Sequence, residues 1–252
     1  RKTFKADNAW KGKQVVLDFE GIMLHGEVWV NGKKIGGTSY GYLGFEADIT
    51  DLIKYEELNV VSVRCSTEGG SRWYTGGGLF RDVHLVVKDK VSIVRHGVFI
   101  TTPTISDQKA EVSVQVEVAG IKNQEYNLEI NTKLYSPEGK QVADTKTMAP
   151  KKSKLTEVEV LLPKVIIANP QLWSCETPNL YSAEVVLVLN GKVIDKVTKK
   201  FGIRTIEFSK EFGFKLNGKK VFLKGVANHH DLGAVGAAAH KTSIARMMEQ
   251  LK

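Results

Sequence analysis

The amino-acid sequence predicts a mainly β protein built from β-sandwich domains, and three features support this prediction. Short segments rich in Val, Ile, Phe and Thr alternate apolar and polar residues, as half-buried strands do. Turn residues separate these segments, and three of the turns contain an Asn-Gly pair. Short strands at this spacing are typical of sandwiches rather than of parallel α/β sheets.

Each of the three Asn-Gly pairs predicts a β-hairpin. Both central residues of a type I′ turn need a positive φ, and the twist of that turn suits antiparallel strands. The predicted hairpins join residues 27–30 to 33–36, 185–189 to 192–197, and 214–216 to 219–223.

The strand pattern divides the chain into three parts, which we expect to be domains or parts of domains. The first, residues 1–90, has predicted strands near 14–20, 26–30, 58–65 and 82–88. The second, residues 91–204, has predicted strands near 111–119, 126–135, 155–161 and 182–189. The pattern changes in the third part, residues 205–252.

The third part predicts the beginning of a different fold. Residues 221–226 form a nearly continuous apolar strand, which is usually covered on both faces, as in a parallel barrel. A helix follows, with Thr242 or Ser243 as its cap and one apolar stripe made of Ile244, Met247, Met248 and Leu251. Because one strand and one helix cannot bury these surfaces alone, we expect neighbouring elements of a longer protein. The alternative is a helix that docks on the second sandwich as a C-terminal cap.

Composition excludes some classes of protein and leaves others open. The net charge is +8, but Lys and Arg are scattered, and the densest basic cluster, residues 151–154, contains no aromatic residues that would suit nucleic acid. No apolar run approaches the ~18 residues of a membrane span. Two cysteines make no disulfide framework, and Cys65, in phase with Val61 and Val63, is expected to be a buried free thiol.

Two stretches contain combinations of residues that packing alone does not require. Residues 71–83 join Trp73 and Tyr74 to three consecutive glycines and end in the pair Arg81-Asp82 before Val83. Glycines permit a close backbone approach or a positive φ, so this loop is a candidate for ligand contact. The alternative is a structural role, in which the two aromatic residues pack between the sandwich and a neighbouring domain.

The second stretch is Asn228-His229-His230-Asp231, which directly follows the apolar strand. In a barrel, the loops at the carboxyl ends of the strands build the active site, so these residues are candidate ligand contacts. A metal site is the alternative, since His and Asp are good ligands. Adjacent histidines in an extended segment point to opposite faces, however, so we expect no metal here.

These motifs together resemble a known family, the β-galactosidase-like members of family 2 glycoside hydrolases. Residues 213–226 with the Asn228–Asp231 stretch resemble the entry into that family's catalytic TIM barrel. Residues 169–174, 178–181 and 201–204 resemble its immunoglobulin-like domain, and residues 28–32 and 71–83 resemble its sugar-binding jelly roll. The resemblance implies a jelly-roll-like sandwich that is incomplete at its N-terminus, an immunoglobulin-like sandwich, and the first βα unit of a truncated TIM barrel.

The resemblance also implies an activity. Such enzymes hydrolyse terminal β-D-galactosides with retention, through two glutamates about 5–5.5 Å apart. The family places these glutamates on later barrel strands, beyond Lys252, so we expect no catalytic residue in this chain and no activity from the chain alone.

Three residues correspond to substrate-binding positions of the family. His229 matches a histidine that hydrogen-bonds the non-reducing sugar, and Asp231 lies near it in the sequence. Arg72 matches a position from which a jelly-roll loop reaches the barrel mouth. It departs from the family, because some members carry an acidic residue there, and Asn228 stands where Arg or Lys is common.

Three other interpretations compete with a β-galactosidase-like protein. They are a non-catalytic carbohydrate-binding module, a surface adhesion protein, and a β-glucuronidase or β-mannosidase of the same family. We expect a β-galactoside or related carbohydrate as partner, with no nucleic acid and no membrane span. The resemblance leaves homo-oligomerisation open. No cofactor is required, although a structural or active-site cation in the full enzyme stays open. Localisation is undetermined by the sequence, and family habit favours a periplasmic or secreted setting.

Overall fold

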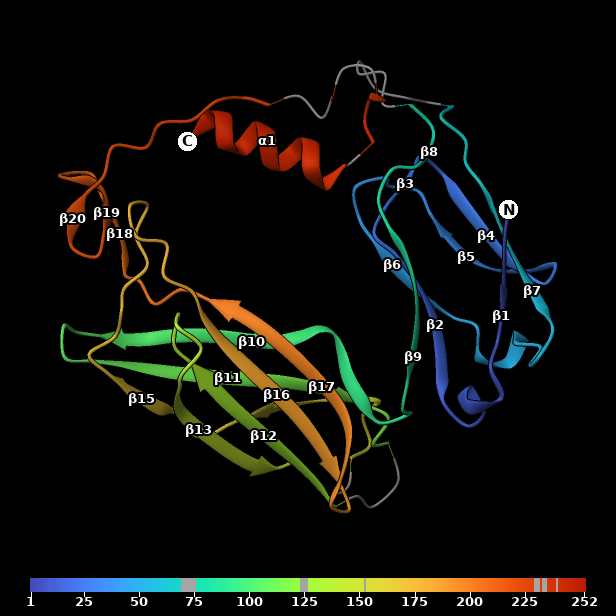
Figure 1. Ribbon diagram of the computed structural model, residues 1–252, viewed down its shortest axis with the longest axis horizontal. Coiled ribbons are helices and arrows are strands. Elements are labelled where there is room, and N and C mark those ends of the chain that lie inside the picture. Colours follow the sequence, from blue (N-terminus) through green and yellow to red (C-terminus); the bar gives the residue numbers. More distant parts are fainter. Residues whose placement is uncertain (69–75, 123–126, 152, 229–231, 233–234, 239) are drawn as a thin grey trace. The chain divides into compact units, whose positions relative to one another are not determined.

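The computed structural model describes residues 1–252 except 69–75, 123–126, 152, 229–231, 233–234 and 239. The described residues fold mainly as β-strands, with a single α-helix near the C-terminus (Figure 1). They form two compact units. The first unit consists of Arg1–Lys88 together with Val226–Lys252, and the second unit consists of Asp89–Gly225.

The first unit contains two main antiparallel sheets. One sheet has the strand order β1 (Lys2–Lys5), β7 (Leu58–Arg64), β4 (Gly26–Val30) and β5 (Lys33–Thr38). The other has the order β6 (Phe45–Asp48), β2 (Gln14–Phe19) and β9 (Val83–Lys88). This unit also contains a short pair, β3 (Ile22–Met23) and β8 (Gly78–Leu79), two 3₁₀ turns, Asn8–Trp10 and Thr50–Leu52, and the helix near the C-terminus.

The core of the first unit lies between these two sheets. Alternate residues of β2 point inward, and so do alternate residues of β4, because successive side chains of a strand face opposite sides. The buried set comprises Val15, Leu17, Phe19, Ile22, Val28, Val30, Ile49 and Val61. Phe19 stacks on Phe45 with the ring centroids 5.0 Å apart. Two sheets with one shared apolar core confirm the predicted first sandwich.

The second unit contains two larger sheets that face each other in Figure 1. In the first, β11 (Lys109–Ala119) pairs with β10 (Ser92–Ile105), β14 (Glu157–Leu161) and β15 (Val165–Ala168). The second has the order β13 (Gln141–Met148), β12 (Leu128–Tyr135), β16 (Tyr181–Leu189) and β17 (Lys192–Phe201). A smaller sheet follows, with the order β18 (Ile206–Ser209), β19 (Gly213–Leu216) and β20 (Lys219–Lys220).

Regular alternation builds the core of the second unit. Five alternate residues of β11 are buried: Ala110, Val112, Val114, Val116 and Val118. They face the buried apolar residues of β12 and β16, which are Leu128, Ile130 and Leu134, and Tyr181, Ala183, Val185 and Leu187. The predicted second sandwich is therefore confirmed, with its strands close to the predicted positions.

All three Asn-Gly hairpins are confirmed. Each Asn has a φ of 50°, and the glycines that follow have φ values of 84°, 81° and 72°. The pairs join β4 to β5, β16 to β17, and β19 to β20. In the third hairpin the ladder is shorter than predicted, because only Lys219 and Lys220 pair with β19.

The predicted apolar strand at residues 221–226 is wrong, since residues 221–228 contain no strand. Phe222 and Leu223 are 83% and 63% exposed. A strand needs a hydrogen-bonding neighbour, and the described part of the chain pairs no strand with this segment beyond the backbone bond from Val221 N to Phe214 O. The barrel start that the sequence predicts is therefore not shown.

The predicted helix exists as α1 (Lys241–Leu251), but its details differ from the prediction. His240 occupies the N-cap position without a side-chain hydrogen bond, so the expected cap by Thr242 or Ser243 is wrong. Both residues already lie inside the first turn. The expected apolar stripe is not buried either: Ile244 and Met247 are half-buried, and Met248 and Leu251 are exposed.

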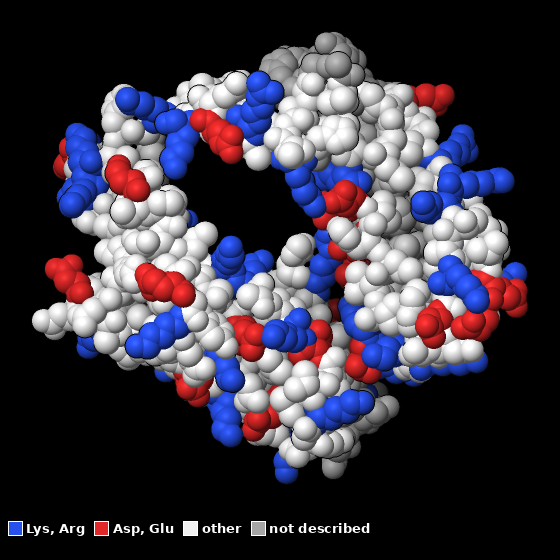
Figure 2. All heavy atoms as spheres, in the orientation of Figure 1, with Lys and Arg blue, Asp and Glu red and all other residues white. Residues whose placement is uncertain are grey.

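The distribution of charged side chains on the surface agrees with their scatter along the sequence. Figure 2 shows Lys and Arg interspersed with Asp and Glu over the visible face rather than gathered in one patch. No helix among the described residues is long and apolar enough to span a membrane. Both cysteines are free. Cys175 is exposed, whereas Cys65 is half-buried rather than fully buried as predicted, and burial raises the pKa of its thiol.

Candidate functional site

The three predicted substrate contacts, Arg72, His229 and Asp231, lie outside the described residues, so their roles stay predictions. The structure does describe the segments beside them. Residues 76–83, the second part of the first motif, lead into β9, and residues 240–251, which follow the second motif, form α1 and its N-cap.

In the second unit, three of the motifs that carry the family resemblance meet at Trp173. Trp173 N donates a hydrogen bond to Ile203 O at 2.8 Å, and Arg204 stacks over the indole ring at 4.6 Å. A Cβ on Gly202 would lie 2.9 Å from the Trp173 side chain, so the glycine permits this close approach. Asn217 donates to Trp173 O at 3.0 Å. These contacts hold the end of β17 in place. We interpret the junction as structural, because its polar groups hydrogen-bond to one another.

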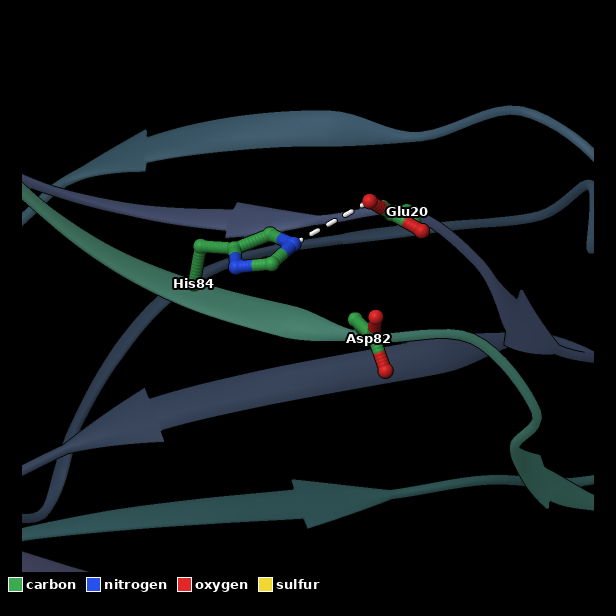
Figure 3. Close-up of side chains that lie close together, drawn as sticks. All are labelled: Glu20, Asp82 and His84. Atoms are coloured by element: carbon green, nitrogen blue, oxygen red, sulfur yellow. Dashed lines mark hydrogen bonds and ion pairs between the residues drawn. The ribbon is translucent and has the colours of Figure 1, made fainter. Parts of the chain in front are cut away.

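In the first unit, the structure brings together Glu20, Asp82 and His84, whose potential ligand atoms all lie within 4.8 Å of one another. Glu20 follows β2 and Asp82 precedes β9, and Glu20 N donates to Asp82 O at 3.1 Å. Since His84 is two residues beyond Asp82, it lies on the same face of the sheet. Figure 3 shows the His84 ring turned toward Glu20, and the ring Nε2 lies 3.1 Å from Glu20 Oε1.

Lys241, the first residue of α1, reaches this cluster from the C-terminal segment. Its Nζ lies 2.6 Å from Asp82 Oδ2. The hydrogen bond and the positive charge of Lys241 lower the pKa of Asp82, and the same contact raises the pKa of Lys241. The contact therefore joins the end of the first motif to the helix that follows the second motif.

The residue types of the cluster suggest two kinds of chemistry, cation binding and acid–base catalysis. Two carboxylates and an imidazole are suitable ligands for a divalent cation such as Zn²⁺, and Glu20, Asp82 and His84 could hold one together. As a glycosidase pair, Glu20 and Asp82 are unsuitable. A general acid needs a raised pKa, whereas that of Asp82 is lowered, and Asp82 and His84 are exposed while Glu20 is half-buried.

Replacing Lys241 with alanine is expected to raise the pKa of Asp82 toward its ordinary value of 3.8. Because the folded-state pKa of Asp82 is lowered, the contact stabilises the fold above the unfolded pKa and is lost as pH falls through the folded pKa. For Lys241 the sign is opposite, so stabilisation is lost as pH rises above the raised pKa, beyond 10.5. Carboxyl NMR titration measures the shift of Asp82. Lys33→Ala, at another exposed lysine of the same unit, should leave it unchanged, and an equal shift there would refute the assignment.

A polar hollow of about 610 Å³ lies over β4, β5 and the end of β7. Its lining includes the charged side chains of Glu27, Lys34, Arg64 and Glu68, together with His25. Glu27 accepts a hydrogen bond from Lys34 and lies 3.6 Å from the Arg64 guanidinium, and these contacts lower the pKa of Glu27. The hollow therefore offers fixed donors and acceptors of the kind that bind hydroxyl groups.

A second hollow, of about 560 Å³, is apolar. It lies beside strands β1 and β9 and is lined mostly by apolar side chains such as Phe4, Leu17, Phe19, Val63 and Leu85. Side chains of this kind suit packing against other apolar groups, and they offer nothing to the hydroxyl groups of a sugar.

Sequence reasoning missed both the Glu20–His84 cluster and the polar hollow. The signal that would have found the cluster is the register of two predicted strands. If residues 14–20 pair with 82–88 so that Glu20 lies opposite Asp82, the period of two places His84 beside them. The contact with Lys241 spans 159 residues and leaves no local trace in the sequence.

Comparison with known proteins gives the class to which these two sandwiches belong. Residues 1–89 match the family model described as "Glycosyl hydrolases family 2, sugar binding domain", and residues 91–204 match "Glycosyl hydrolases family 2". The chain belongs to glycosyl hydrolase family 2.

Particular relatives agree with this assignment. The chain is 32% identical to the beta-galactosidase BoGH2A of Bacteroides ovatus, over 100% of the chain and 30% of the relative. It is 32% identical to a beta-glucuronidase of Bacteroides fragilis, over 95% of the chain and 36% of the relative. A crystal structure of a family 2 member from Bacteroides cellulosilyticus superposes with a TM-score of 0.94 at 36% identity, over 99% of the chain and 34% of that structure. The chain thus spans about a third of the length of these relatives.

Proposed function

We propose that the chain forms the β-sandwich part of a retaining glycoside hydrolase whose substrates are terminal β-D-galactosides. The observation that carries the proposal is the match to beta-galactosidase BoGH2A, which runs through the whole chain but covers only 30% of that enzyme. We place the two catalytic glutamates in a part of the protein outside residues 1–252.

The carboxyl groups of the described residues support this placement. Those with a displaced pKa are all shifted downward, and they are Glu27, Asp48, Glu56, Asp82, Glu138, Glu176 and Glu211. The acid of a glycosidase needs the opposite shift, since it must hold a proton near neutral pH. We therefore assign this chain the positioning of the sugar, through Arg72, His229 and Asp231, and not the cleavage of the glycosidic bond.

The test compares residues 1–252 with the polypeptide made from the complete natural reading frame. Only the complete polypeptide is expected to hydrolyse aryl β-galactosides. In it, His229→Ala should lower kcat/KM by roughly 10- to 100-fold, which is the effect of one lost hydrogen bond to a charged or strongly polarised group.

His240→Ala, at a histidine outside the motif, is the matched control and should change kcat/KM little. Turnover by residues 1–252 alone would contradict the proposed division of roles. Faster hydrolysis of aryl β-glucuronides or β-mannosides than of β-galactosides would contradict the proposed substrate.

The polar hollow favours a second candidate, a carbohydrate-binding module without chemistry. Its carboxylate and cationic groups could accept and donate hydrogen bonds to sugar hydroxyls at Glu27, Lys34 and Arg64. If this candidate holds, titration calorimetry of residues 1–252 with galactose and its oligosaccharides should detect millimolar or tighter binding that Arg64→Ala abolishes. Lys33→Ala is the control. The absence of binding in the parent chain would exclude this candidate.

A further inference from the structure

The three Asn-Gly turns offer a matched set of reactive dipeptides. The turn at 190 reads Leu189-Asn190-Gly191-Lys192, and the turn at 217 has the same four residues, Leu-Asn-Gly-Lys. The turn at 31 differs only in a valine before the asparagine. All three asparagines have the same φ of 50°. Sequence and backbone therefore give these sites nearly equal reactivity, and any difference between them must come from the side-chain contacts.

Two of the three asparagines have their side-chain amides held by hydrogen bonds. The Asn31 Nδ2 donates to Leu52 O at 2.8 Å and to Asn59 Oδ1 at 2.9 Å, and its Oδ1 accepts from Val60 N at 2.9 Å. Asn31 is half-buried. Both the oxygen and the nitrogen of this amide are thus fixed in place.

Asn217 is held in the same way. Its Oδ1 accepts from Thr205 N at 3.0 Å, and its Nδ2 donates to Trp173 O at 3.0 Å. It is half-buried as well. Any reaction that rotates this amide must break both hydrogen bonds.

Asn190 differs from both. Its side chain is exposed, and it has no hydrogen-bond partner among the residues that the structure describes. Only its backbone N–H is engaged, with Asn127 O at 3.1 Å. The side-chain amide is therefore free to rotate toward the backbone nitrogen of Gly191.

We propose that Asn190 is a site of spontaneous deamidation, and that Asn31 and Asn217 are protected from it. In this reaction the backbone nitrogen of Gly191 loses its proton and attacks Cγ of Asn190. A C–N bond forms, the side-chain nitrogen leaves as ammonia, and a cyclic succinimide results. Water then opens the ring at one of its two carbonyls to give aspartate or isoaspartate. No oxidant or cofactor is needed.

The product changes the hairpin between β16 and β17. Either acid adds a negative charge to an exposed turn. Isoaspartate also routes the main chain through the side-chain methylene, which lengthens the turn by one atom. This modification is independent of the proposed function, because it needs only the turn and water.

The test incubates the folded chain at mildly alkaline pH, where the attacking nitrogen is more readily deprotonated. Overlapping proteolytic digests and mass spectrometry then follow the mass increase at each of the three sites. Asn190 should react at least about tenfold faster than Asn217, the factor expected for breaking one or two hydrogen bonds. The same measurement in denaturant serves as the control, and there the two identical tetrapeptides should react at equal rates.

Two results would overturn the proposal. One is an equal rate at Asn190 and Asn217 in the folded chain. The other is a difference that persists after unfolding, because the contacts would then not be its cause. An Asn190→Gln variant should lose the signal of this turn while the other two sites are unaffected, and a remaining signal there would mean that the site was wrongly assigned.

Discussion

Replacing Leu187 with alanine is expected to lower the free energy of unfolding of the second unit by about 3 kcal/mol, within the ~2–5 kcal/mol typical of such truncations. Leu187 is fully buried on β16, and its partner across the ladder is Ile130 on β12, also fully buried. The truncated side chain leaves a cavity in a core drawn from both sheets, and neighbours fixed by strand pairing cannot collapse into it. Hydrogen exchange of the β12 and β16 amides measures the loss within this unit.

Leu161 provides the matched control for this prediction. It is also a leucine in a strand of the second unit, β14, but it is 60% exposed. Leu161→Ala should change the free energy of unfolding by no more than about 0.5 kcal/mol. Equal effects of the two substitutions would mean that the core of this unit is not where the structure places it.

Replacing Asn59 with alanine should cost the first unit about 3 kcal/mol, since each buried polar group left without its partner costs ~1–3 kcal/mol. Asn59 is fully buried on β7. Its Oδ1 accepts from Lys54 N and Asn31 Nδ2, both at 2.9 Å, and its Nδ2 donates to Lys54 O at 2.7 Å and to Glu57 O at 3.2 Å. Alanine removes all four bonds, so the Lys54 N–H, the Lys54 and Glu57 carbonyls and the Asn31 amide each lose a partner.

Hydrogen exchange of the β4 and β7 amides, the two strands next to this network, measures the effect. Asn8→Ala is the control, because Asn8 is an exposed asparagine of the same unit. Asn31→Ala should show partial non-additivity with Asn59→Ala, since the two side chains share a hydrogen bond. A loss at Asn59 no larger than at Asn8 would show that the network contributes nothing to stability.

The parts of the fold that follow from local chemistry were predictable from the sequence. The alternation in β11 and β16 marks their buried faces, because a strand with one covered face needs an apolar residue at every second position. The Asn-Gly pairs identify their turns because few other residues adopt two successive positive φ values. These two signals locate the strands and turns from which both sandwiches were predicted.

The errors lie where structure depends on neighbours. Residues 221–226 have the composition of a covered strand, but a strand exists only where another strand hydrogen-bonds to it, and composition does not reveal whether one is present. Helix α1 begins before Thr242 and Ser243, so the local preference of these residues for capping did not determine its start. Its apolar stripe likewise has a helical period but is not buried in the described structure.

Candidate site residues were less accessible to sequence reasoning than the fold. Arg72, His229 and Asp231 came from resemblance to a family, and they remain predictions. The cluster of Glu20, Asp82 and His84 requires the register of two strands about 60 residues apart, as the His84–Glu20 separation of 64 shows. A register of that kind is set by the packing of the whole sheet.

The unequal exposure of the two thiols makes the chain suitable for single-site labelling. Alkylation requires the thiolate, so partial burial and a raised pKa slow the reaction of Cys65. Exposed Cys175 is reached first, and a fluorophore attached there would be two residues from the Trp173 indole. Energy transfer or quenching between dye and indole would then report when the junction of Trp173 with Ile203 and Asn217 opens, while the first unit carries no dye.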